Sequence, residues 1–146
     1  MAKAAQAAPT SVEVRRTVAA SRERVFQAWT RPEELKKWAA PGAMTAPMAE
    51  VDLRVGGKYR IEMHAPDGAT HIVSGEYREV APPKRLVYTW GWEDGTVKDS
   101  VVTVEFQERG KSTEVILRHE RLPSAESRAR HTEGWIGCMD KFEALF

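Results

Sequence analysis

Cysteine, long apolar runs and net charge are all scarce in this sequence. The single cysteine, Cys138, cannot form an internal disulfide, and its apolar neighbours predict a small buried side chain in a reducing compartment. No stretch approaches the length of a membrane span, and the N-terminus lacks the sustained apolar run of a signal peptide. We therefore expect a cytoplasmic protein without a membrane span.

The near absence of net charge argues against nucleic acid as a partner. Lysine and arginine total 22 against 21 aspartate and glutamate, which leaves a formal charge of +1. Basic residues are scattered among acidic ones, as in RRTVAASRERVF. Nucleic acids and anionic membranes bind concentrated positive charge, so we expect neither to be bound through charge.

Short motifs for metal, nucleophile or phosphate chemistry are missing as well. The four histidines are spread along the chain, and there is no His-x-His or Cys-x-x-Cys pair, so we expect no metal. No serine lies in a G-x-S-x-G elbow. The Gly56–Gly57 pair is not followed by a helical pattern, which favours a hairpin turn over a phosphate loop. We expect no cofactor.

The pattern of apolar residues predicts one domain at residues 11–146, after a disordered tail at residues 1–10. Alternation predicts strands at residues 11–18, 48–55, 58–64, 70–80, 85–92, 99–108 and 112–120. Three-and-four spacing and N-cap residues predict helices after Ser21, at residues 32–38 and from Ser124 to the end, and residues 39–47 are expected to form a loop.

This order predicts an α+β fold in which a seven-stranded, curved antiparallel sheet wraps round the long C-terminal helix. Two short helices follow the first strand. Alternation and helical spacing then assign the side chains that face the space between sheet and helix. The candidate ligand contacts on this inner face are Tyr59, Met63, Tyr88, Trp90, His119, His131, Trp135 and Met139.

Two interpretations of this inner face remain open: a dry aromatic core and a cavity. The polar atoms of tyrosine and tryptophan need partners when buried, which favours a cavity. Gly134 and Gly137 on the last helix point the same way, because each costs about 1 kcal/mol of helix stability relative to alanine. His119 and His131 are candidate catalytic acids or bases, or polar anchors; alternatively, they form a hydrogen-bonded pair that closes the cavity mouth.

Several segments together resemble a known superfamily. The segments VFQAWTRPEELKKWAAP, VDLRVGGKYRIEM, GEYREVAPPKRLVYTW, TEVILRHERLP and GWIGCMDKFEAL occur in the order and spacing of the SRPBCC superfamily, with its START-like, helix-grip fold. Within it, the chain resembles the group homologous to the activator of the heat-shock-protein-90 ATPase. The resemblance runs from about Ser11 to Phe146 and implies the same sheet, two short helices and a long helix over a cavity.

Three functions are consistent with the residues and the resemblance. The first is binding of a small, largely apolar ligand in the cavity, as superfamily members bind lipids, sterols, hormones or polyketides. The second is an enzyme of cyclase or hydrolase type that uses the cavity histidines. The third is a protein-interaction module, in which chaperone regulation and a homodimer are both left open. The resemblance alone does not choose among them.

Overall fold

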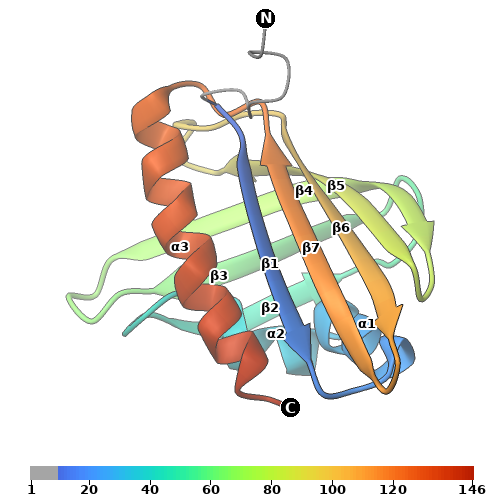
Figure 1. Ribbon diagram of the computed structural model, residues 1–146. Helices are drawn as coiled ribbons and strands as arrows, with labels where there is room; N and C mark the ends of the chain where they lie inside the picture. Colours follow the sequence, from blue (N-terminus) through green and yellow to red (C-terminus); the bar gives the residue numbers. More distant parts are fainter. Residues whose placement is uncertain (1–9) are drawn as a thin grey trace, which may run out of the picture.

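The computed structural model describes residues 10–146 and has the predicted helix-grip architecture (Figure 1). The elements in chain order are β1 (Val12–Val18), α1 (Arg22–Thr30), α2 (Pro32–Trp38), β2 (Thr45–Val51), β3 (Lys58–His64), β4 (Thr70–Ala81), β5 (Arg85–Trp92), β6 (Ser100–Arg109), β7 (Ser112–Glu120) and α3 (Ala125–Glu143). The predicted disordered tail lies outside the described residues, except for Thr10, whose carbonyl accepts a hydrogen bond from the Leu122 amide at 3.1 Å.

Within residues 10–146, seven strands form one antiparallel sheet in the order β1-β7-β6-β5-β4-β3-β2. Strands β2 to β7 follow one another through short connections, and β1 pairs with β7 at the far edge. The curled sheet has α3 lying across it, with α1 and α2 gathered at the end where β1 finishes (Figure 1). One face of the sheet is therefore enclosed by helices, and the other faces outward.

Side-chain contacts of the C-terminal half of α3 hold this helix across the sheet. Arg16 of β1 donates to Asp140 at 2.8 Å and to Glu143 at 3.0 Å. Lys141 Nζ donates to the carbonyls of Ala40, at 2.6 Å, and Met44, at 2.9 Å, in the loop between α2 and β2. The helix is thus tied to the edge strand on one side and to this loop on the other.

Alternation along the strands assigned the inner face correctly. On β7, the inward set that runs from Thr113 to His119 at every second residue is fully buried. On β6, Val102, Val104 and Phe106 are equally buried. Because the strand period is two, the intervening residues face outward.

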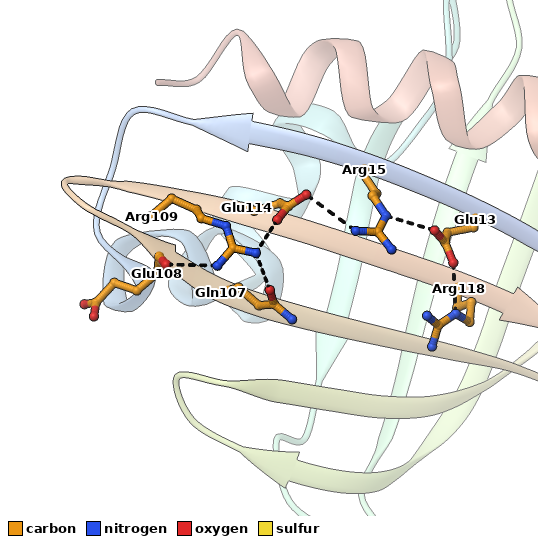
Figure 2. A network of polar contacts seen from close by, with 7 residues as sticks. All are labelled: Glu13, Arg15, Gln107, Glu108, Arg109, Glu114 and Arg118. Atoms are coloured by element: carbon orange, nitrogen blue, oxygen red, sulfur yellow. Dashed lines mark hydrogen bonds and ion pairs between the residues drawn. The ribbon is translucent and has the colours of Figure 1, made fainter.

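The outward face of β1, β7 and β6 carries a ladder of ion pairs (Figure 2). Glu13 accepts from Arg15 at 2.9 Å and from Arg118 at 3.1 Å, while Glu114 accepts from Arg109 at 2.7 Å and lies 3.7 Å from Arg15. Exposed pairs of this kind contribute about 0–1 kcal/mol each. This face is therefore a solvated, polar surface, unlike the enclosed face.

The prediction for the second strand was wrong at both ends. We expected residues 48–55, but β2 spans Thr45–Val51. It begins earlier because it is an edge strand, where the proline at position 47 is tolerated at a register irregularity between Thr45 and Met48. It ends earlier because the Arg54 amide donates to the Asp52 carbonyl and starts a turn. The connection to β3 therefore takes six residues, 52–57, and Gly56 has a φ of +84°.

Candidate functional site

A cavity of about 460 Å³ lies between the enclosed face of the sheet and α3. Its walls hold all five tryptophans and all three tyrosines of the chain, namely Trp29, Trp38, Tyr59, Tyr77, Tyr88, Trp90, Trp92 and Trp135. The four phenylalanines are not in its walls; three of them, Phe26, Phe106 and Phe142, are buried in the solid core. Rings with a polar atom thus surround the space, and purely apolar rings pack elsewhere.

One end of the cavity is a cluster of three tyrosines from β3, β4 and β5. The ring centroids of Tyr59, Tyr77 and Tyr88 lie 5.2–5.9 Å apart. Tyr59 donates to the Thr89 carbonyl at 2.6 Å, and Tyr88 accepts from the indole of Trp29 at 3.1 Å. Burial raises the pKa of all three phenols, so they remain protonated donors at neutral pH.

The two predicted histidines lie near the opposite end, His131 in the wall and His119 behind it, and they meet edge to face with ring centroids 5.1 Å apart. His131 Nδ1 donates to the Ser127 carbonyl at 2.7 Å, and its Nε2 accepts from the indole of Trp92 at 3.0 Å. His119 Nδ1 accepts from the indole of Trp135 at 3.0 Å. Its Nε2 is therefore protonated and donates to the Ser100 hydroxyl at 2.8 Å, because that hydroxyl in turn donates to the Trp90 carbonyl.

These partners leave neither histidine with a free lone pair. Burial, together with the nearby His131, lowers the pKa of His119 to about 3. Burial also lowers the pKa of His131; the hydrogen bond to the Ser127 carbonyl opposes that shift, and Arg130 reinforces it. Both rings are therefore neutral at pH 7. A general base needs a lone pair directed at its substrate, and here each lone pair is already accepting an indole N–H.

The mouth of the cavity lies beside the histidine end and is polar. His71 of β4, Asp94 and Thr96 of the loop between β5 and β6, and Arg130 of α3 contribute to its lining. Asp94 accepts from the amide and hydroxyl of Thr96, at 2.9 and 2.7 Å, and these bonds lower its pKa. Charged groups are therefore confined to the rim, while the interior is aromatic and aliphatic.

Six of the eight predicted contact residues lie in the cavity wall: Tyr59, Met63, Tyr88, Trp90, His131 and Trp135. The other two predicted contacts, His119 and Met139, do not line the cavity. His119 is fully buried behind the wall, where it orients Trp135 and Ser100. Met139 is also fully buried. It lies one helical turn after Trp135 on α3, towards Phe142, and does not line the cavity.

Sequence reasoning did not pick out Tyr77, Trp29 or Trp38 as wall residues. Tyr77 adjoins a register irregularity on β4, between Tyr77 and Glu79, which breaks the alternation that identified its neighbours. The two tryptophans come from the short helices α1 and α2, whereas every predicted contact came from a strand or the last helix. Their shared feature, an aromatic ring with a polar atom, was the available signal.

The two glycines of α3 differ in their surroundings. Gly134 lies in the cavity wall, and a Cβ placed on it would meet nothing within 4 Å. Gly137 faces the loop after α2, where a Cβ would lie 2.9 Å from Pro41 Cβ and 3.3 Å from the Gly42 amide. Gly134 therefore borders the cavity that both glycines were expected to indicate, whereas Gly137 permits close packing of helix and loop.

Cys138 also lies in the wall, beside the tyrosine end. Burial raises the pKa of its thiol to about 12, against a smaller opposite effect of Lys141. The thiolate is the reactive form, so Cys138 acts here as a small apolar side chain.

A comparison with protein families matches residues 19–146 to the activator of Hsp90 ATPase homolog 1-like family. The chain belongs to this family. The match covers both short helices, the six strands that follow and the whole of α3. The Hsp90 ATPase activator homolog family lies within the SRPBCC superfamily, so the predicted membership is confirmed.

Solved structures show the same fold in proteins of similar length. A Chromobacterium violaceum protein is 28% identical with a TM-score of 0.88, and covers 94% of this chain and 97% of its own. The AHSA1 protein of Silicibacter pomeroyi is 28% identical with a TM-score of 0.83, and covers 92% and 96%. A Nitrosomonas europaea protein is 26% identical with a TM-score of 0.81, and covers 96% of each chain. No curated protein matches the chain.

Among residues 10–146, no three histidine, cysteine, aspartate or glutamate side chains gather in a way that could hold a metal ion. In the same residues, no helix is long and apolar enough to cross a membrane.

Proposed function

We propose that this protein binds a small, largely apolar molecule in the cavity between the sheet and α3. The observation that carries the proposal is the placement of every tryptophan and tyrosine around the cavity, with the phenylalanines elsewhere. A cavity of about 460 Å³ falls within the size range of small-molecule sites, roughly 300–1,000 Å³. An apolar interior with polar groups at few points is typical of such sites.

The enzymatic alternative has less support, because His119 and His131 have committed both ring nitrogens to protein partners. The interaction alternatives rest on isolated exposed apolar side chains. Met48, Leu53 and Val55 lie on or beside edge strand β2, and Ile136 lies on α3. A homodimer, regulation of a chaperone and a cytoplasmic location all stay predictions.

Mass spectrometry of the freshly purified protein tests the binding proposal. Sprayed under native conditions, the protein is expected to carry an adduct that is lost on denaturation. Gly134→Leu should abolish the adduct, because the new side chain occupies the cavity where a Cβ meets no neighbour. Glu133→Leu, at an exposed neighbouring position on α3, is the matched control and should keep it.

Two results would contradict the proposal. If Gly134→Leu retains the adduct, the bound ligand lies outside this cavity. A bare native mass, combined with no detectable binding of the apolar ketone described below, would show that the cavity takes no ligand of this class. The same spectra report monomer or dimer directly and so test the predicted homodimer.

A further inference from the structure

The tyrosine end of the cavity contains hydrogen-bond donors that the protein leaves unused. The Tyr77 hydroxyl has no hydrogen-bond partner among residues 10–146, although the residue is only 4% exposed. A polar atom that lacks a protein partner is either fully covered, as Trp90 Nε1 is, or in contact with open space. The Tyr77 oxygen is not fully covered, so it borders open space. We assign that space to the cavity, because Tyr77 is part of its wall.

A second donor lies next to it. The Tyr88 oxygen accepts the indole N–H of Trp29, and its own proton has no acceptor among the described residues. The rings of Tyr77 and Tyr88 are 5.9 Å apart, and neither phenol ionises near neutral pH. By contrast, the hydroxyl of the third member of the cluster, Tyr59, donates a hydrogen bond to the Thr89 carbonyl.

Buried polar groups in folded proteins nearly always have partners, so an unused donor facing a cavity indicates what the occupant supplies. We propose, on the basis of the binding function proposed above, that the ligand is an apolar molecule with a neutral carbonyl oxygen that accepts a hydrogen bond from Tyr77, with Tyr88 as a neighbouring second donor. The apolar body then extends past Ile61, Met63 and Trp90 towards the mouth.

The absence of charge at this end selects a neutral acceptor over a carboxylate. In the described wall, the basic side chains His71, Arg130 and His131 lie at the mouth or the histidine end. An ionised carboxylate buried among three phenols would lack a cation, and burying an unpaired charge is costly. A ketone, an ester or a protonated acid avoids this cost while satisfying the phenol protons.

Benzophenone and 1,1-diphenylethylene provide a matched pair of probes, because they differ mainly in C=O against C=CH₂. Isothermal titration calorimetry measures the affinity of each for the unaltered protein and for Tyr77→Phe. We expect Tyr77→Phe to weaken benzophenone about 3- to 10-fold, the range of one net hydrogen bond, and to change diphenylethylene less than about twofold. The carbonyl stretch of bound benzophenone should shift to higher frequency in Tyr77→Phe.

Tyr59→Phe is the control, because it removes a hydroxyl from the same cluster whose proton is already donated to Thr89. It should affect both probes equally. If neither probe binds the unaltered protein, this assignment fails, and the proposed function fails with it where the native mass is also bare. If both probes bind but Tyr77→Phe weakens them equally or not at all, and the stretch does not move, cavity binding stands and the carbonyl assignment is overturned.

Discussion

His119 shows at the scale of one residue how hydrogen bonds define the protonation state of a buried ring. The indole of Trp135 donates to one nitrogen, and the Ser100 hydroxyl, itself donating to a carbonyl, accepts from the other. A second proton on the ring would face the Trp135 N–H directly. The residue therefore supports the cavity wall as a neutral scaffold, and this role has a measurable dependence on pH.

The buried imidazole should make the protein less stable as pH falls. In the folded chain the pKa of His119 is about 3, against about 6.5 when unfolded. Between these values only the unfolded chain takes up the proton, so the free energy of unfolding is highest above pH 6.5. It falls by on the order of 1 kcal/mol per pH unit below about pH 6.5. Urea unfolding between about pH 7 and about pH 5 measures this slope.

His119→Gln, which can still accept from Trp135 and donate to Ser100, should reduce that slope. His64→Gln removes a histidine whose side chain is 44% exposed, and serves as the control. An unchanged slope in His119→Gln would mean that the buried imidazole is not the group responsible.

At the scale of one element, α3 has two glycines for two different reasons. Alanine at position 134 has room and a better helix propensity, so Gly134→Ala should raise the free energy of unfolding by about 0.5–1 kcal/mol. Alanine at position 137 would press on Pro41, so Gly137→Ala should lower the free energy of unfolding by about 1–3 kcal/mol. Urea unfolding of the two variants checks both values. Stabilisation by both would show that the loop after α2 yields easily.

How much of each element could be predicted depended on how regular its pattern is. The alternation through β7 fixed which side chains face inward, and helical spacing placed His131 and Trp135 on one face of α3. Helical spacing does not show where along that face a cavity ends, which is why Met139 was assigned to the wall. Edge strand β2 was misplaced because hydrogen bonds in the turn at Asp52 and Arg54, and not apolar pattern, determine its end.

At the scale of the whole molecule, an occupied cavity should stabilise the fold by mass action. Benzophenone at a hundred times its dissociation constant should add about 2.7 kcal/mol to the free energy of unfolding. For a domain of this size, that corresponds to a rise in Tm of roughly 5–10 °C. Scanning calorimetry measures the shift. Gly134→Leu should show none, and an equal shift in that variant would locate binding elsewhere.

The two faces of the sheet also differ in character, one polar and one aromatic. The outward face of β1, β7 and β6 is covered by the ion-pair ladder around Glu13 and Glu114 (Figure 2), whereas the inward face holds the rings. Since exposed ion pairs contribute little to stability, the ladder chiefly keeps the outer face polar. The sequence predicted this division, but it could not decide between a dry core and a cavity, because that depends on how rings of known direction fill a three-dimensional space.

The arrangement of the rings also has an optical consequence. Because every tryptophan and tyrosine of the chain lines the cavity, all of the intrinsic ultraviolet emission originates from its walls. The outer face contributes no background light. Trp29 and Trp38, with centroids 4.5 Å apart, are close enough to exchange excitation energy, and Trp90 and Trp92 emit beside neutral imidazoles. The wavelength and intensity of the intrinsic fluorescence should therefore report the contents of the cavity without an added dye.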